Sequence, residues 1–470
     1  MKRVVVVGGG AAGLGAAYTL KKRGLTPILL EAENHVGGRL AADEVDGFLI
    51  DTGVDFFCYS YDAVFRICGE LDVPLVHSRQ NLGWYRDGRW LVTSADPTMS
   101  GLVRNLRAAP GLGLLSRGSL KLIRNIFRQA DYLTFASDSR MADIDGDESF
   151  GEYCSRIGVS ESLQVTLKGF VANGVLSDVD ASSQAYVRGY LANTMLRPHR
   201  LMQPEKGAGA LARALRDSCA DVTRVSTPVR EIVVRERRAT SVETDGGTIE
   251  ADAVICAVPA PRALDIIPDL PDRVRDTLRT VTYSSACRLV MGLDHPPLPP
   301  GWHGAIYPED ETPLMLDRSI NLPGCVPSGK STLDLIAGRE RAKELLELDD
   351  DEIKREMLRD ARRNPPPGSA LPGDDEGLFS RVYRWKIAVC EGPPGMFEAV
   401  ANARRELGAD IPNLFLAGDY TRVPLVNGAL ASGISAAEEA VAQLTSQPHS
   451  TRDPGIAGRR HQPVESGLHT

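Results

Sequence analysis

Three glycines near the N-terminus have the spacing of a loop that holds a dinucleotide. Gly8, Gly10 and Gly13 follow an unbroken apolar run, Val4 to Val7, which is typical of a parallel strand buried on both faces. The first glycine permits a tight turn, the second lets the backbone approach a pyrophosphate, and the third lets the next helix pack closely on the strand. That helix, expected from Ala11 to Arg23, would direct its N-terminal amides at the phosphates.

An acidic residue stands where such a site needs a ligand for the ribose. The segment TPILLEAE predicts a second strand that ends at Glu31, 18 residues after Gly13. A carboxylate there accepts hydrogen bonds from ribose hydroxyls and repels a 2′-phosphate. A glycine-rich turn that binds nothing is the alternative, but the strand, glycines, helix and acid follow one another in the order that a dinucleotide site requires.

The next stretch indicates which dinucleotide is bound. Glu31, Ala32, Gly37, Gly38 and Arg39 form an E-A-x-x-x-x-G-G-R pattern, which resembles the flavin-binding signature of the amine oxidase superfamily. This superfamily includes monoamine oxidases, protoporphyrinogen oxidases and carotenoid desaturases. The two glycines let the backbone pass close to a cofactor, and the arginine can neutralise diphosphate charge. The resemblance implies non-covalently bound FAD.

Two later segments resemble the rest of a flavin domain. The segment Val229–Pro261 predicts antiparallel strands around the turn Asp245-Gly246-Gly247, followed by a buried strand. In similar flavoproteins, a residue at the position of Val229 meets the adenine through its backbone, although an ordinary hairpin is the alternative. The segment Asn413–Val441 predicts a strand that ends at Gly418-Asp419, where the family places an acid near the ribityl chain or the diphosphate.

A helix rich in small residues is expected from about Gly428. Its N-terminus would direct unpaired amides at the pyrimidine edge of the flavin, and its small residues would allow a close approach. Ordinary helix packing is the alternative. The resemblance places the following residues at the cofactor: Gly8, Gly10, Ala11, Ala12, Gly13, Glu31, Ala32, Gly38, Arg39, Gly53, Val229, Gly418, Asp419, Asn427, Gly428 and Ala429.

These segments lie at both ends and in the middle of the 470 residues, so the cofactor domain is expected to be discontinuous. The predicted fold class is α/β, with a Rossmann-like FAD/NAD(P)-binding domain of the glutathione-reductase type and an interleaved α+β substrate domain. We assign residues 1–75, 201–264 and 406–444 to the first domain, 76–200 and 265–405 to the second, and 445–470 to a disordered tail. The substrate domain should be helical in its first half and contain a strand at SSACRLVMGLD.

Composition excludes several classes of function. A formal net charge of −8 argues against nucleic acid as a partner. Eight scattered cysteines, without a His/Cys cluster, support neither a metal site nor a dithiol redox centre and suit a reduced, cytoplasmic protein. No apolar run reaches about 18 residues, so no transmembrane helix is expected. No second GxGxxG follows a strand, so electrons are expected to leave for oxygen, a quinone or another soluble acceptor.

The substrate side differs from monoamine oxidases. The stretch before Gly428 has no aromatic residue, Arg288 aligns where those enzymes carry a lysine, and Cys390 is no counterpart of a flavin-tethering cysteine. Carotenoid-desaturase and squalene-processing relatives are more similar in the C-terminal segments, although Asn427 replaces their usual glutamate. The catalytic candidates are Arg288, Trp385 and Tyr420, each of which also suits a packing or surface role.

The resemblance therefore implies an FAD-dependent oxidoreductase that dehydrogenates or oxidises a largely apolar small molecule by hydride transfer to flavin N5. An isoprenoid, a carotenoid precursor or a tetrapyrrole would fit. Amine or amino-acid oxidation is the first alternative. A flavin-dependent isomerase, or a scaffold in which the flavin is structural, is the second.

Two further groups of residues bear on partners. The helical segment 101–129 carries basic residues and no acid, so it is expected either to form a solvated basic face or to contact an anionic membrane peripherally. His199, His295 and His303 are expected in loops or at the surface, without a metal.

Overall fold

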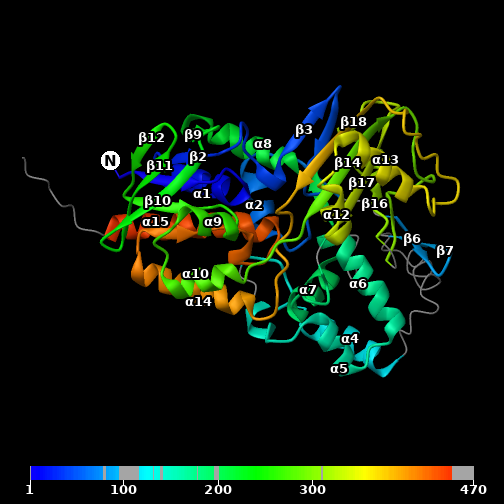
Figure 1. Cartoon of the computed structure of the whole chain (residues 1–470), viewed down its shortest axis with the longest axis horizontal. Coiled ribbons are helices and arrows are strands. Elements are labelled where there is room, and N and C mark those ends of the chain that lie inside the picture. The colour runs from blue at the N-terminus through cyan, green and yellow to red at the C-terminus, as the bar shows by residue number, and fades with distance from the viewer. Residues whose placement is uncertain are drawn as a thin grey trace, which may run out of the picture.

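The computed structural model describes residues 2–77, 81–94, 116–130, 132–137, 141–176, 178–194, 201–308 and 311–446. Figure 1 shows three regions: a layered region with a parallel sheet on the left, a second sheet at the upper right, and a group of helices at the lower right. The mixed α/β architecture confirms the predicted fold class.

The layered region is built on a five-stranded parallel sheet in the order β19-β13-β1-β2-β9. Its strands are β1 (Val4–Val7), β2 (Ile28–Leu30), β9 (Thr223–Arg224), β13 (Ala253–Cys256) and β19 (Leu414–Leu416). The valines of β1 are at most 3% exposed, as predicted for a strand buried on both faces. The strand order reverses at β1, with β2 on one side and β13 on the other, and open parallel sheets bind ligands at such a point.

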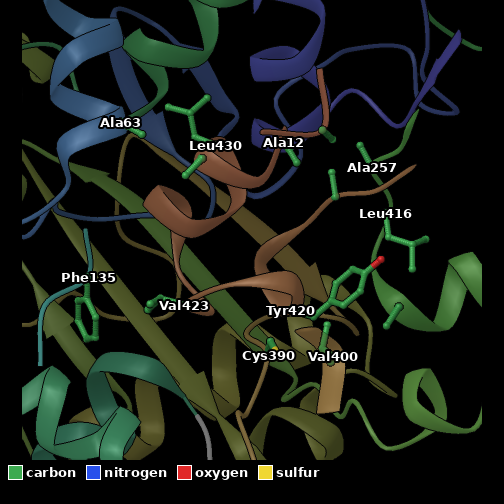
Figure 2. Packing of buried hydrophobic residues seen from close by; sticks show 14 of the residues in the cluster. Ala12, Ala63, Phe135, Ala257, Cys390, Val400, Leu416, Tyr420, Val423 and Leu430 are labelled. Atoms are coloured by element: carbon green, nitrogen blue, oxygen red, sulfur yellow. The ribbon is translucent and has the colours of Figure 1, made fainter. Parts of the chain in front are cut away.

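Two helices from opposite ends of the chain pack against each other in this region. Helices α1 (Ala11–Lys22) and α15 (Val426–Ser446) approach closely because small residues face each other. A Cβ atom on Gly433 would lie 1.9 Å from the carbonyl oxygen of Ala12. Figure 2 shows Ala12 and Leu430 among the buried side chains of this core. Helix α15 starts two residues before its predicted start, and Gly433 serves helix packing.

The predicted antiparallel strands form a three-stranded sheet of β10 (Val229–Arg235), β11 (Arg238–Thr244) and β12 (Gly247–Glu250). The predicted turn, Asp245-Gly246-Gly247, joins β11 to β12, and its last residue is the first residue of β12. A second turn, at Glu236-Arg237, joins β10 to β11 with φ angles of 50° and 60°. The region also contains the pairs β3 (Ala42–Val45) with β4 (Phe48–Asp51) and β5 (Leu75–His77) with β8 (Met202–Pro204), and the helices α2 (Asp62–Glu70), α8 (Gly209–Ser218), α9 (Ala260–Ile266), α10 (Asp272–Arg279) and α14 (Met396–Asp410).

The second sheet has seven strands in the order β18-β14-β17-β16-β15-β6-β7. The strands are β6 (Leu82–Arg86), β7 (Arg89–Thr93), β14 (Ala286–Leu293), β15 (Gly304–Ile306), β16 (Leu314–Leu316), β17 (Ser331–Gly338) and β18 (Phe379–Trp385), accompanied by the helices α11 (Arg318–Asn321), α12 (Arg339–Leu345) and α13 (Asp350–Ala361). Strand β14 confirms the strand predicted at SSACRLVMGLD. Cys287, Leu289 and Met291 join the apolar core beside α13, so the alternate residue Arg288 faces the opposite side of the sheet.

The third region consists of α4 (Arg117–Arg128), α5 (Phe150–Ile157), α6 (Glu161–Val175) and α7 (Gln184–Thr194). It is helical, as predicted for the first half of the substrate domain, but the described part of that half also contains strands β6 and β7, which belong to the second sheet. Residues 101–115 lie outside the described residues. One apolar core joins these helices to the parallel sheet, and α10 and α14 belong to that same core. The division at 264 and 406 stays a prediction, as does the tail, because only Thr445 and Ser446 of the tail are described.

Candidate active site

A cavity of about 990 Å³ extends from the parallel sheet to the second sheet. One half of it is lined by the residues that follow the parallel strands: Gly8 after β1, Glu31 after β2, Ala257 after β13 and Gly418 beyond β19. Parallel strands end at the same edge of a sheet, so segments far apart in sequence meet there. The predicted residues Ala11, Ala12, Ala32, Gly38, Gly53 and Val229 also line the cavity.

The glycine loop has the shape of a pyrophosphate cradle. Gly8 adopts a φ of +99°, and a Cβ atom on Gly13 would lie 1.7 Å from the Gly8 carbonyl oxygen, so neither position accepts another residue without strain. A Cβ atom on Gly10 would meet nothing within 4 Å, which leaves this backbone open to the cavity. No side chain caps the start of α1, so its first amides are available to an anion.

Glu31 is fixed against this loop by two backbone amides. Its Oε2 accepts a hydrogen bond from the Gly9 amide at 2.6 Å, and its Oε1 accepts one from the Glu33 amide at 2.9 Å. A carboxylate has about four acceptor positions, so ribose hydroxyls could still donate to it. The glycines of the GGR pattern pack on the same loop, since the Gly37 amide donates to the Gly9 carbonyl at 2.8 Å.

Arg39 and Asp419 form an ion pair at the cavity wall. Arg39 Nη1 donates to Asp419 Oδ2 at 2.6 Å and to the Ala388 carbonyl at 2.7 Å. The Tyr283 hydroxyl donates to Asp419 Oδ1 at 3.1 Å. Burial alone would lower the pKa of Arg39, but Asp419 and Tyr283 raise that pKa above its usual value. The guanidinium therefore stays charged and can face a diphosphate.

The start of α15 differs from the expectation. Ala429 lines the cavity, but Asn427 and Gly428 do not. The Asn427 side chain is buried, where it accepts from the Val64 amide at 3.0 Å and donates to the Phe135 carbonyl at 2.8 Å. A Cβ atom on Gly428 would lie 1.9 Å from the carbonyl oxygen of Val423. These two residues therefore hold the start of the helix against its neighbours instead of facing the cavity.

Two of the three catalytic candidates line the cavity. Arg288 does so from β14, and Trp385 does so from the end of β18, where its Nε1 donates to the Thr52 carbonyl at 2.8 Å. Tyr420 is absent from the cavity wall, because its ring is buried in the first core. Figure 2 shows it among the packed side chains of that core. We therefore assign Tyr420 to packing and withdraw it as a candidate for substrate contact.

Arg288 belongs to a buried ionic cluster that sequence reasoning missed. Arg318 donates to Asp51 at 2.7 Å, Asp55 at 2.6 Å and Asp334 at 2.9 Å. Arg288 donates from Nη2 to Asp55 at 2.9 Å and also to Asp334. The isolated arginine in the apolar strand ACRLVMGL was the one available signal. Asp55 and Arg318 have no motif around them, so only the fold reveals them.

Further polar side chains surround this end of the cavity. Gln203 is buried and its amide has no hydrogen-bond partner among the described residues. His303 lies in a loop, which is one of its two predicted settings, but it is 6% exposed and lines the cavity instead of the surface. Burial lowers the pKa of His303 to about 4. His295 lies in a bend, as predicted, with 43% of its side chain exposed, and His199 lies outside the described residues.

Much of the remaining wall of this half of the cavity is apolar, lined by Leu82, Phe170, Leu176, Ile306, Leu314 and Ile336. Within the described ranges, no three His, Cys, Asp or Glu side chains are grouped as metal ligands. Cys390 is buried beside Met396 and does not line the cavity. None of the described helices has the length and apolar character needed to cross a membrane.

Comparisons with known proteins agree with this geometry. Residues 11–441 match the family model of flavin containing amine oxidoreductases. The chain is 23% identical over 466 residues to coproporphyrinogen III oxidase of Bacillus subtilis, covering 89% of this chain and 93% of that protein. It is 26% identical over 475 residues to coproporphyrinogen III oxidase of Mycobacterium tuberculosis, covering 93% and 97%. The fold is similar to that of cyclohexylamine oxidase from Brevibacterium oxydans, with a TM-score of 0.71 and 17% identity over 94% of this chain and 99% of that one.

Proposed function

The chain belongs to the flavin containing amine oxidoreductase family and is an FAD-dependent oxidoreductase. From that premise, we propose that it dehydrogenates a porphyrinogen-type tetrapyrrole. Relatives named coproporphyrinogen III oxidase align along nearly the whole chain. The observation that carries the proposal is the cavity, which combines a large apolar wall with a polar end at Asp55 and Arg288. A tetrapyrrole has an apolar ring skeleton and polar nitrogen atoms, so it suits both surfaces.

The residues of the cofactor half fit FAD. We propose that Gly8, Gly10 and the start of α1 hold the pyrophosphate and that Glu31 holds the ribose. Arg39 and Asp419 would lie toward the diphosphate and the ribityl chain. When bound, FAD supplies the acceptor for the two electrons removed from the substrate. The protein's part is to orient the substrate against it and to exclude water with the apolar wall.

An amine substrate is less well supported. The side chain at position 288 is an arginine, which stays charged and cannot act as a base. Its two partners, Asp55 and Asp334, hold it within the ionic cluster. We propose that reoxidation uses oxygen or a quinone, since no second dinucleotide motif in the sequence provides for a nicotinamide as the electron acceptor.

Anaerobic mixing of the FAD-loaded protein with substrates tests the proposal. Without an acceptor, coproporphyrinogen III should abolish the visible absorbance of oxidised flavin, whereas primary amines should not. A fluorescent porphyrin should form only after an acceptor is admitted, because the conversion to porphyrin removes more electrons than one FAD accepts. When oxygen is admitted, hydrogen peroxide should accumulate if oxygen is the acceptor. A quinone added in place of oxygen tests the other acceptor. Loss of absorbance with amines alone would support amine oxidation. Product formed only by prereduced protein would support the isomerase.

We also propose that α4 contacts an anionic membrane surface. Leu120 and Phe127 lie seven residues apart on one face of α4 and are 50% and 61% exposed. The charged residues of this helix are all basic and exposed: Arg117, Lys121, Arg124 and Arg128. Apolar side chains between cations are typical of helices that lie in the membrane interface.

A further inference from the structure

We propose that Asp55 is a substrate-binding residue that accepts hydrogen bonds from nitrogen-bound hydrogens of the substrate at the polar end of the cavity. This inference deepens the proposed function and rests on it for the choice of a pyrrole over an ammonium group. Both groups present N–H donors, so the recognition chemistry is shared.

The accessible polar atom of the ionic cluster belongs to Asp55. Among the three carboxylates of the cluster, that of Asp55 lines the cavity, with 21% of its side chain exposed, whereas Asp51 and Asp334 are 3% and 0% exposed. Asp55 Oδ1 accepts from Arg288 and Arg318, but its Oδ2 has no partner among the residues that the structure describes. Arg288 and Arg318 also line the cavity, but their side chains are only 2% and 4% exposed, so the Asp55 carboxylate is the most accessible group of the cluster.

The charge of the cluster favours donors over anions. Three carboxylates face two guanidinium groups, which leaves one negative charge in excess. The nearby His303 does not neutralise it at pH 7, because its pKa is lowered to about 4. A substrate carboxylate at this point would add a second uncompensated charge in a poorly hydrated site, whereas an N–H donor meets a charged acceptor.

The cluster also holds this acceptor in place. Arg318 connects Asp55 to Asp51, whose carboxylate accepts from the amides of Ala208 and Gly209 at 2.9 Å and 2.8 Å. These amides start helix α8, so the position of Asp55 is tied to the cofactor region as well as to the second sheet. An acceptor fixed before the substrate arrives loses little entropy on binding.

Matched small ligands test the inference without turnover. The FAD-loaded protein is titrated with dipyrromethane and its N,N′-dimethyl analogue, and separately with 4-phenylbutylamine and butylbenzene, while the visible flavin spectrum and tryptophan fluorescence are followed. We expect dipyrromethane to bind about tenfold more tightly than its methylated analogue. In the Asp55→Asn variant, this ratio should fall to about twofold.

A charge-matched variant distinguishes a direct contact between the ligand and Asp55 from the general effect of removing one negative charge. Asp334→Asn removes the same charge from the same cluster at a side chain that does not line the cavity. It should keep the discrimination between the two dipyrromethanes. The proposal would be overturned if both variants lost the preference for dipyrromethane equally, or if Asp55→Asn kept the full preference. If Asp55→Asn does not fold by circular dichroism, Asp55→Glu, which keeps the charge but displaces the acceptor, should reduce the ratio.

The two ligand pairs distinguish this inference from the proposed function. One outcome is that the protein binds the amine more tightly than butylbenzene in a way that depends on Asp55, yet binds the two dipyrromethanes equally. That result would keep Asp55 as the acceptor and contradict the porphyrinogen substrate. Absence of discrimination in both pairs with the wild-type protein would reject Asp55 as the acceptor.

Discussion

Arg39 and Asp419 lie 380 residues apart in the chain, and their side chains meet at 2.6 Å on the wall of the cavity. The pair joins the GGR loop to the turn after β19, so this part of the wall exists only when both ends of the chain have folded together. Asp419 also accepts from Tyr283, which adds a third segment. The effect of each such contact on FAD affinity or on stability can be measured with a single variant.

The Asp419→Asn variant should bind FAD roughly tenfold more weakly, because Arg39 loses its charged partner and its fixed position. The measurement is the dissociation constant of FAD from absorbance or flavin fluorescence. Glu438→Gln, which breaks the exposed pair Arg23–Glu438, is the control and should leave FAD affinity unchanged. Unaltered affinity in Asp419→Asn would remove this residue from the proposed cofactor site.

The Glu31→Ala variant should also lose FAD affinity, by about tenfold or more. It removes the proposed acceptor for the ribose and releases the Gly9 amide that Glu31 holds at 2.6 Å. Titration of the flavin-free protein with FAD gives the affinity, and Glu44→Ala, at an exposed position of β3, is the control. Equal affinities for the two variants would contradict the ribose assignment.

The Gly433→Ala variant should be destabilised by about 1–3 kcal/mol, because its methyl group would meet the Ala12 carbonyl where α15 crosses α1. Thermal unfolding with and without FAD measures the effect. Gly408→Ala is a control of opposite sign, since a Cβ atom there meets nothing within 4 Å in an exposed part of α14. That change should stabilise the helix by about 0.5–1 kcal/mol.

His303 should make stability depend on pH between 6.5 and 4. Its pKa falls from 6.5 to about 4 because it is buried, so in this window the unfolded chain binds a proton that the folded protein does not. The contribution is fully present above pH 6.5 and is lost as the pH falls toward 4, by roughly 3 kcal/mol. Urea unfolding at several pH values should show this slope.

The His303→Leu variant should flatten that slope. His295→Gln is the matched control, because a hydrogen bond to Asp294 raises the pKa of His295 and its effect has the opposite sign. A slope that survives in His303→Leu would assign the pH dependence to other groups.

Replacement of both Leu120 and Phe127 by Ser should reduce binding to vesicles that contain phosphatidylglycerol. The apolar contribution is lost while the four cations of α4 remain, so the residual binding should be weaker and more sensitive to salt. Co-sedimentation with vesicles measures this, and phosphatidylcholine vesicles should bind neither protein. Leu378→Ser, which changes a leucine that is 49% exposed elsewhere on the surface, should bind like the wild type. Vesicle binding by the double variant equal to that of the wild type would reject α4 as the contact.

Local patterns in the sequence were enough to predict the N-terminal part of the cofactor half. The valines of β1, the glycine loop, Glu31 and the GGR stretch follow one another within 39 residues, so their relative positions depend on a strand, a turn and a helix whose geometry is local. The antiparallel strands after Val229 were predictable for the same reason, because alternation and turn glycines are features of contiguous residues.

The substrate half depended on the tertiary structure. Asp55, Arg288, Arg318 and Asp334 come from separate segments, and no local pattern shows that their charges meet. Likewise, the sequence did not show that His303 lines the cavity, or that Asn427 and Tyr420 are buried away from it. The physical reason is that a buried charge or polar group is tolerated only where distant segments supply its partners, and that match is decided by the folded chain as a whole.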